Sequence, residues 1–506
     1  MTTYPKKALY LTLAAASVAA GLSTVTAATA APADVRPTAP APQLSWHTCA
    51  DPDVPTGQEC AELPVPLDYD DPDGRQLTVA VSRIRSDRPE ARRGTLVVLP
   101  GGPGGSGVQR LKLKGDALRR ELGGAYDLVA FDPRGVGAST TATCGLAPED
   151  RYLTSLRSWP GPNGEITENI ARSRRIAEAC ALGGGPELRS FTTANQVRDM
   201  DRFREALGER KLSAWGTSYG TYVGAVYAQK YPQRTDRWVL DSSGDPDPER
   251  VARGWLANMS QGAADRFPDF AAWAVHPDRD EDGLRLAGRP EEVEPLVLSL
   301  AAALDRAPRE STTPGVPLTG NGLRQALQNA LYSDSAFAPF ARLVKEAGDP
   351  AKKPALPREL AQPIPDPDAA LMVAVICNDV EWPDVPMASY QRAVDADRAR
   401  HPLTAGMPVN VLPCSFWKDA PAQKPTRITD DGPSNILLLQ SRRDPATPLF
   451  GGLKMREALG DRARMVTVEQ GGHGLYLGNG NACGNRAVTE FLTTGRRPAR
   501  DTDCAN

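Results

Sequence analysis

Residues 212–232 read LSAWGTSYGTYVGAVYAQKYP: a short apolar run, a serine between glycines, and a helix-like stretch. This order predicts a strand, a sharp turn and a helix, the nucleophile elbow in which the backbone at Ser218 is strained. Glycines are needed at 216 and 220 because a Cβ there would collide with the neighbouring strand or helix. Pro232 ends the helix. The motif alone also fits an ordinary glycine turn with a spare serine, so the rest of the chain has to decide.

The composition of the 506-residue chain is that of a globular protein, with 41% hydrophobic and 24% charged residues. A net charge of -3 gives no electrostatic reason to expect a nucleic acid or an anionic membrane as a partner. The length allows one large domain with an insertion. We expect a monomer that binds no nucleic acid.

The first 30 residues have the pattern of a secretory signal peptide. Lys6 and Lys7 precede an apolar stretch at 8–22, and small side chains follow before residue 31. A transmembrane anchor needs about 20 apolar residues, and this run is shorter and interrupted by polar ones. We predict a secreted, extracellular protein without a stable membrane anchor, with the signal peptide at 1–30 and a Pro- and Ala-rich linker at 31–45.

Eight cysteines, an even number, fit export to an oxidising compartment in which they form disulfides. Spacing cannot determine their connectivity, but we expect sequence neighbours to pair. The alternative is metal binding; the chain has no C-x-x-C or H-x-x-x-H spacing and only four scattered histidines, so we expect no metal. The expected pairs are Cys49 with Cys60, Cys144 with Cys180, Cys377 with Cys414, and Cys483 with Cys504.

A glycine-rich loop follows an apolar run at 95–99 that predicts a buried parallel strand. The loop, 100–107, reads PGGPGGSG and contains the G-x-G-x-x-G pattern of dinucleotide sites, with Asp132 after a later strand as the acid. Against that alternative, Pro103 lacks a backbone donor, and an exported protein meets little nicotinamide cofactor. Such a loop can also point backbone N–H groups at an oxyanion, and we predict this role for Gly102.

Other stretches before the elbow are predicted to be structural. Residues 76–84 alternate apolar and polar side chains and predict an edge strand. Residues 132–139 read DPRGVGAS, a charged turn in which Asp132 and Arg134 brace adjacent loops. Residues 140–190 predict an irregular excursion clipped by a disulfide.

An acid and a histidine each follow a predicted strand late in the chain. Asp444 comes after the strand at 435–440, and His473 comes after the strand at 465–469. Alone, Asp444 fits a solvated loop carboxylate and His473 a packed loop histidine. With Ser218 they stand at the carboxyl ends of predicted strands in the order Ser, Asp, His, which is the order in α/β hydrolases.

These elements predict an α/β-hydrolase fold, a mostly parallel sheet with an inserted helical cap. We assign 46–243 and 409–506 to the hydrolase core. The alternation of strands and helices disappears at 244–408, and we assign that range to the cap. Helical periodicity within it is present at 251–259, 292–304, 321–331 and 340–347.

The predicted chemistry is acyl transfer through a covalent serine intermediate. His473 would take the proton of Ser218 as its Oγ attacks a carbonyl carbon, and Asp444 would hold the imidazole tautomer. The N–H groups of Tyr219 and Gly102 would bind the oxyanion. Water then hydrolyses the acyl-enzyme, so neither a metal nor an organic cofactor is required.

The chain contains four glycine-containing motifs that can be compared with known families: PGGPGGSG at 100–107, DPRGVGAS at 132–139, GTSYGT at 216–221 and GGHG at 471–474. Together they resemble those of the secreted tripeptidyl aminopeptidases, in the prolyl aminopeptidase branch of the α/β hydrolases. The resemblance runs from about Trp46 to the C-terminus, with 409–506 as the C-terminal region typical of the family. It implies a serine exopeptidase that releases short peptides from free N-termini of peptides or proteins. Many prolyl aminopeptidases have His where Pro100 stands, so a proline specificity is not implied.

A free substrate N-terminus carries a positive charge that carboxylates must meet when it is desolvated. Residues 377–383 read CNDVEWP and follow an apolar run. We predict that Asp379 and Glu381 bind the substrate amine. The alternative is a solvent-facing acidic turn.

Other functions are compatible with parts of the pattern. The nearest is a secreted carboxylesterase or lipase-like hydrolase, because one triad acts on esters and amides alike. A catalytically inactive binding protein is disfavoured by the intact triad. A nicotinamide oxidoreductase is supported only by the glycine pattern at 100–107.

Overall fold

A ten-stranded sheet forms the centre of the computed structural model, which describes residues 42–251, 253–419, 421–479 and 481–505. The predicted signal peptide and most of the predicted linker lie outside the described residues. The strands are β1 (His47–Thr48), β2 (Gln58–Pro66), β3 (Gln76–Ile84), β4 (Gly94–Leu99), β5 (Tyr126–Phe131), β6 (Leu212–Thr217), β7 (Thr235–Asp241), β8 (Ile436–Arg443), β9 (Ala463–Gly471) and β10 (Thr502–Cys504). Their order is β1-β2-β3-β5-β4-β6-β7-β8-β9-β10.

Seven neighbouring strands, from β5 to β10 in that order, run parallel, and β1, β2 and β3 pair antiparallel at one end. This sheet confirms the predicted α/β-hydrolase fold. The prediction that residues 76–84 form an edge strand is wrong, because β2 pairs with β3 along its whole length. The alternation in β3 has another cause: one of its faces is only partly buried.

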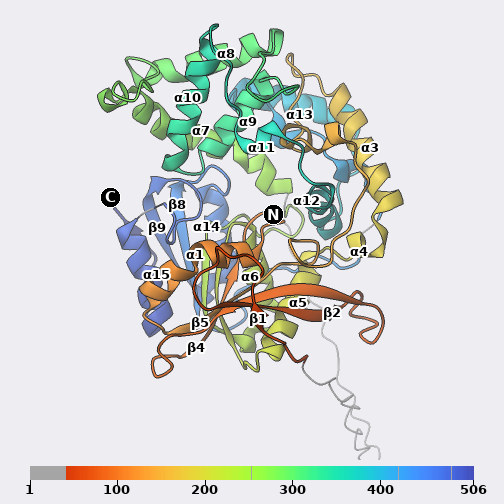
Figure 1. Cartoon of the computed structure of the whole chain (residues 1–506), viewed down its shortest axis with the longest axis vertical. Coiled ribbons are helices and arrows are strands. Elements are labelled where there is room, and N and C mark those ends of the chain that lie inside the picture. The colour runs from red at the N-terminus through yellow and green to blue at the C-terminus, as the bar shows by residue number, and fades with distance from the viewer. Residues whose placement is uncertain (1–41, 252, 420, 480, 506) are drawn as a thin grey trace, which may run out of the picture. The chain divides into compact units, whose positions relative to one another are not determined.

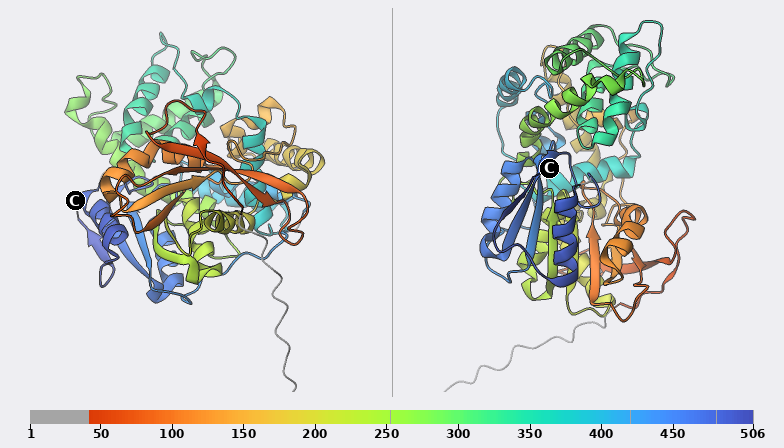
Figure 2. Two further views of the ribbon diagram at one scale, coloured as in Figure 1. Left: turned by 60° about the horizontal axis from the view of Figure 1, so that its bottom comes forward. Right: turned by 90° about the vertical axis from the view of Figure 1, so that its left-hand side faces the viewer.

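Helices cover both faces of the sheet, which is why its parallel strands are continuously apolar (Figures 1 and 2). Val97 and Leu99 of β4 point into one core layer, whereas Leu96 and Val98 point into the other. The helices of the first layer are α5 (Thr193–Ala206), α6 (Tyr219–Lys230) and α14 (Leu449–Leu459), and those of the second are α1 (Gly107–Leu122) and α15 (Ala482–Thr494).

Seven α-helices lie between β7 and β8 and gather at one end of the sheet (Figure 1). They are α7 (Arg253–Val275), α8 (Val293–Arg306), α9 (Gly320–Ala330), α10 (Phe337–Gly348), α11 (Arg358–Ala361), α12 (Asp366–Asp379) and α13 (Met387–Arg400). Four of them, α7 to α10, enclose a core of their own, in which Phe270 packs against Phe337 and Phe340. This region corresponds to the predicted cap.

The stretch between β5 and α5 belongs with these helices and not with the sheet. It contains α2 (Leu153–Leu156), α3 (Thr167–Gly183) and α4 (Gly185–Arg189), and α3 lies beside α13 in Figure 1. Trp159 Nε1 donates to Gln325 Oε1 of α9 at 2.9 Å, and Ser158 Oγ donates to the Val411 carbonyl at 2.6 Å. The predicted core segment 46–243 therefore includes a second piece of the cap, which long-range hydrogen bonds hold in place.

Four disulfides join the eight cysteines, and each joins two cysteines that follow one another in the order of the chain. Cys49–Cys60 links β1 to β2, Cys144–Cys180 closes the excursion onto α3, Cys377–Cys414 ties α12 to the chain before β8, and Cys483–Cys504 ties α15 to β10. All four join segments that the fold brings together.

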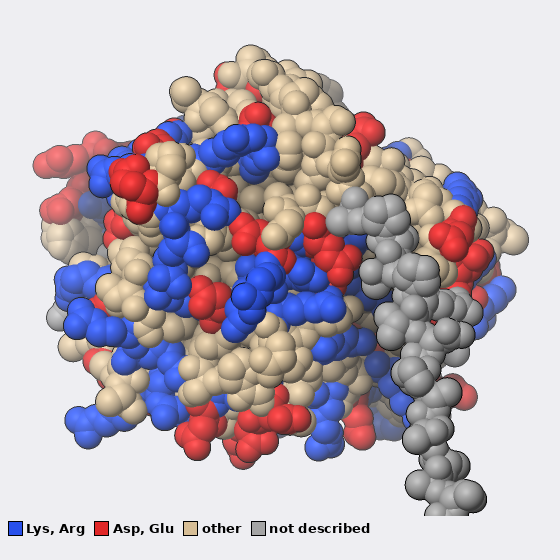
Figure 3. Space-filling model, turned by 90° about the horizontal axis from the view of Figure 1, so that it is seen from below, with Lys and Arg blue, Asp and Glu red and all other residues tan. Residues whose placement is uncertain are grey.

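Charges of both signs are interspersed over the face of the molecule in Figure 3. Of the helices in the described residues, none has the length and hydropathy that a membrane span requires.

Candidate active site

Ser218 lies at the turn between β6 and α6, with φ 60° and ψ −126°. The left-handed φ is unfavourable for a residue with a Cβ and lifts the side chain out of the sheet. A Cβ on Gly216 would lie 2.4 Å from the Gly220 carbonyl oxygen, and one on Gly220 would lie 2.5 Å from the Leu99 carbonyl oxygen. Both glycines are therefore required by close backbone contacts, as the sequence pattern suggested.

Asp444 and His473 form a hydrogen-bonded pair at the carboxyl ends of β8 and β9. His473 Nδ1 lies 2.9 Å from each carboxylate oxygen of Asp444. Asp444 is fully buried, and its Oδ1 accepts from the backbone N–H groups of Ala446 and Thr447 at 2.8 Å each. Thr447 Oγ1 also donates to Asp444 Oδ2 at 3.0 Å. These bonds orient the side chain of Asp444 against the imidazole of His473.

The pair determines how activity should depend on pH. Burial lowers the pKa of His473, but the charge and hydrogen bond of Asp444 raise it, and the net pKa is higher than usual. A general base must be neutral, so kcat/KM should rise through a pKa above the ordinary histidine value of about 6.5 and level off at higher pH. The measurement is a pH–rate profile with a neutral substrate. A profile that stays flat from acid to neutral pH would exclude His473 as the base.

A second carboxylate, Asp241 at the end of β7, holds the histidine loop. Its two oxygens accept from the backbone N–H groups of Leu475 and Tyr476, both at 2.9 Å. Next to it, Ser242 Oγ accepts from the N–H of Gly474 at 2.9 Å. Sequence reasoning missed this function of Asp241, although a carboxylate that ends an apolar strand was a visible signal.

The predicted oxyanion donors lie beside Ser218. Gly102 and Tyr219 line a cavity with Ser218, and Tyr219 opens α6, where the first N–H groups of a helix lack partners within it. The loop before α1 approaches the serine closely, since a Cβ on Gly101 would lie 2.9 Å from Ser218 Cβ. The glycines therefore bring this backbone to the nucleophile, which is the requirement for an oxyanion donor.

The dinucleotide alternative receives no support from Asp132. This buried carboxylate accepts from Ser106 Oγ at 2.6 Å and from the N–H of Val108 at 3.0 Å, so it caps α1. Arg134, in the same turn, forms a buried ion pair with Asp199 at 2.6 Å. The turn braces its surroundings, and the buried Asp132 carboxylate is already engaged at the start of α1.

Two spaces meet at Ser218. One is a cavity of about 240 Å³ whose lining includes Tyr219 and mostly apolar side chains of the cap, among them Trp255, Met259 and Ile376. The other is a more open cleft of about 620 Å³ lined by His473 and Gly102. Ser218 and Gly102 line both spaces, whereas His473 lines only the cleft.

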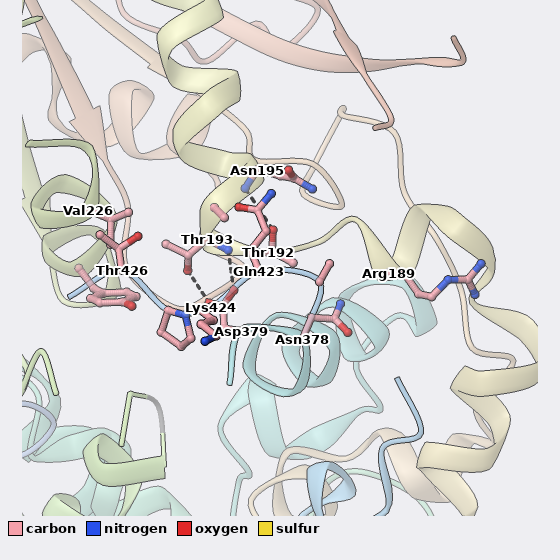
Figure 4. Close-up of a pocket in the computed structure, with 14 residues that line it drawn as sticks. Arg189, Thr192, Thr193, Asn195, Val226, Asn378, Asp379, Gln423, Lys424 and Thr426 are labelled. Atoms are coloured by element: carbon pink, nitrogen blue, oxygen red, sulfur yellow. Dashed lines mark hydrogen bonds between the residues drawn. The ribbon is translucent and has the colours of Figure 1, made fainter. Parts of the chain in front are cut away.

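Asp379 is placed elsewhere, in a smaller cavity with Thr193 and Lys424 (Figure 4). It accepts from the N–H and the Oγ1 of Thr193, at 2.8 and 2.5 Å, and so caps α5. Burial raises the pKa of the Asp379 carboxyl to about 6. Thr193 Oγ1 is 2.6 Å from the hydroxyl of Tyr219, so Asp379 is two hydrogen bonds behind a residue that lines the catalytic cavity.

Glu381, the other acid predicted to bind the amine, is exposed and follows the end of α12. It lines neither of the two spaces at Ser218. The structure therefore brings Ser218, His473, Asp444, Gly102 and Tyr219 together, and leaves Glu381 apart from them.

The fold and the elbow define an enzyme of the serine hydrolase class. The C-terminal residues 402–504 match the family model described as "TAP-like protein". The chain is 34% identical over 484 residues to a tripeptidyl aminopeptidase of Streptomyces lividans, covering 91% of this chain and 86% of the relative. It therefore belongs to the tripeptidyl aminopeptidase family of α/β hydrolases, as the motifs indicated.

Two further relatives differ in the activity their names carry. The serine protease Hip1 of Mycobacterium tuberculosis H37Rv is 28% identical over 490 residues, covering 91% of each chain. Carboxylesterase B of Mycobacterium tuberculosis is 29% identical over 492 residues, covering 92% of this chain and 90% of the relative. The relatives of this chain are thus named both as peptidases and as a carboxylesterase.

Proposed function

We propose that this protein is a secreted serine exopeptidase that releases tripeptides or similarly short peptides from free N-termini. The observation that carries the proposal is the strained Ser218 beside the His473–Asp444 pair, in a chain 34% identical to a tripeptidyl aminopeptidase. Ser218 attacks the carbonyl carbon, His473 moves the proton to the leaving amine, and Tyr219 and Gly102 donate to the oxyanion. The four disulfides support export, for which residues 1–30 would be the signal.

The test is hydrolysis of a panel of peptide anilides with one to four residues, each with a free and an acetylated N-terminus, beside simple butyrate esters. An exopeptidase should cleave the free-amine peptides and lose most of its kcat/KM on acetylation, because the amine loses its charge and gains bulk. The peptide length with the highest kcat/KM reports the length of the peptide released. Equal or better hydrolysis of acetylated peptides would contradict the exopeptidase proposal.

For the substrate amine we retain Asp379 as the predicted partner. Its carboxylate is partly buried and forms no ion pair with the described residues. The cavity that it lines is separate from the two spaces at Ser218, so a substrate ammonium would have to pass Tyr219 to supply the missing countercharge. Asp379→Asn should then raise KM for free-amine peptides about 10-fold and change hydrolysis of a neutral ester little. Lower pH, through about 6, should raise KM in the wild type in the same way.

The outcomes of that test separate two roles. An equal loss on peptides and esters would show that Asp379 only caps α5 through Thr193 and that the amine site lies elsewhere. Glu381→Gln is the matched control, because it removes an exposed acid of the same segment.

A carboxylesterase is the second candidate, and one observation favours it. Among the described residues that line the cavity beside Tyr219, none is Asp or Glu, so the cavity suits a neutral acyl group better than an ammonium. Fast hydrolysis of butyrate esters without hydrolysis of any peptide in the panel would select this function.

A further inference from the structure

The two spaces at Ser218 differ in whether the catalytic histidine predicted from the sequence lines them. In the triad mechanism the histidine returns its proton to the leaving group, so the leaving group must lie beside the histidine. His473 lines the open cleft and does not line the cavity beside Tyr219. We therefore expect the acyl part of the substrate in the apolar cavity and the leaving group in the open cleft.

The open cleft has a one-sided charge. Arg110, Lys114 and Arg157 line it, and no Asp or Glu is among the described residues of its lining. Asp241, whose charge acts on Arg110 and Lys114, is fully buried and already accepts from the backbone of the histidine loop. A leaving group in this cleft thus faces cations that no lining carboxylate neutralises.

Two of these cations have partners within the protein. Arg110 donates to Thr217 Oγ1 at 2.9 Å and lies over the Trp215 ring, 4.8 Å from its centroid. Lys114 Nζ donates to the Leu477 carbonyl at 2.6 Å. Burial lowers the pKa of both groups, because it removes water from a charge that no carboxylate pairs with at short range.

Arg157 differs from them in having no partner. Its guanidinium forms no hydrogen bond or ion pair with the described residues, and its Nε is buried. The backbone around it is nevertheless held, because its N–H donates to the Leu153 carbonyl at 2.9 Å and the next two side chains, Ser158 and Trp159, bond to the cap. A fixed backbone thus places an unpaired guanidinium at the wall between both spaces.

We propose that the open cleft binds a carboxylate on the leaving-group side of the scissile bond and that Arg157 pairs with it. The inference rests on the proposed hydrolase mechanism and specifies its substrate class. Guanidinium groups bind carboxylates with two parallel hydrogen bonds, which suits a planar anion at this position. The carboxylate is either an acidic side chain next to the scissile bond or the free C-terminus of a short peptide.

Matched peptides test the proposal and distinguish the two sources. C-terminally amidated peptides with glutamate or glutamine after the scissile bond test the side chain, and tetrapeptides with a free or amidated C-terminus test the terminal carboxylate. At least one pair should show a kcat/KM about 10-fold higher for the carboxylate, mostly through KM, and the preference should shrink as salt rises. Equal values within both pairs, in an enzyme that cleaves them, would overturn the proposal.

Variants identify the residue. Arg157→Gln should remove most of the preference, Arg157→Lys should keep part of it, and Arg342→Gln should keep all of it. Arg342 is a matched control because it is exposed on α10, away from the cleft. A folded Arg157→Gln enzyme with the wild-type preference would overturn the assignment to Arg157.

A pair of esters separates failure of this inference from failure of the peptidase function. Butyrate esters of para-hydroxybenzoate and para-hydroxybenzamide share an acyl group and differ by a carboxylate on the leaving group. If no peptide is cleaved, the peptidase function fails, but a ratio of ester rates that falls about 10-fold in Arg157→Gln still supports the carboxylate site. An ester ratio that is the same in wild type and variant overturns the site whether or not peptides are cleaved.

Discussion

Replacing Ser218 by alanine should lower kcat by about 10⁶ and abolish labelling by a fluorophosphonate. The loss should be this large because Ser218 Oγ would form the covalent intermediate. The Ser218 side chain is the one presented at the strained turn between β6 and α6. Alanine keeps the Cβ, so the backbone strain at φ 60° is unchanged and thermal unfolding should be close to that of the wild type. Activity, labelling and melting temperature are the measurements.

Ser299→Ala is the control for this substitution. Ser299 is exposed on α8 of the cap and lines neither of the two spaces at Ser218. Its variant should be labelled and should turn over substrate like the wild type. Labelling that persists in Ser218→Ala would transfer the nucleophile to another residue.

Replacing Asp444 by asparagine should lower kcat by about 10⁴ and change the free energy of unfolding little. The asparagine Oδ1 can still accept from the N–H groups of Ala446 and Thr447. Its amide, however, would donate to His473 Nδ1, so the proton of the neutral ring would move to the nitrogen that must accept from Ser218. Steady-state kinetics and a urea unfolding curve measure the two effects separately.

Two carboxylates provide the comparison for Asp444→Asn. Asp461 is fully exposed in the turn before β9, and Asp461→Asn should have wild-type kinetics. Asp241 is buried beneath the histidine loop and contributes to the electrostatic field at His473. If Asp444→Asn kept a tenth or more of the activity while Asp241→Asn lost it, the acid of the triad would be Asp241.

Much of the sheet could be predicted because its signals are local. The apolar runs of β4 and β8 are buried on both faces and read as strands without knowledge of their neighbours. The nine-residue strand β2 was missed, because its pairing with β3, with Cys60 opposite Ser82, is a tertiary contact. Without β2, the half-buried β3 resembled an edge.

The candidate site also contains residues that local sequence signals could predict and residues that they could not. Ser218, Asp444 and His473 were predicted from local motifs and their order, which depend on turns at strand ends. Arg157 gave no signal, because its position in the cleft results from bonds of the next residues to Val411 and Gln325, far away in the sequence. Such contacts leave no periodicity or motif in the chain.

The sequence by itself determined the class of fold and the elbow and predicted the triad, because glycine sterics and strand burial act within a few residues of each position. Only the tertiary structure decided the chemistry of the space around Ser218. It showed an apolar cavity on one side and a cationic cleft on the other, and it placed Asp379 behind Tyr219. The physical reason is that cavities are bounded by side chains from distant segments, whose meeting depends on how the cap packs over the sheet.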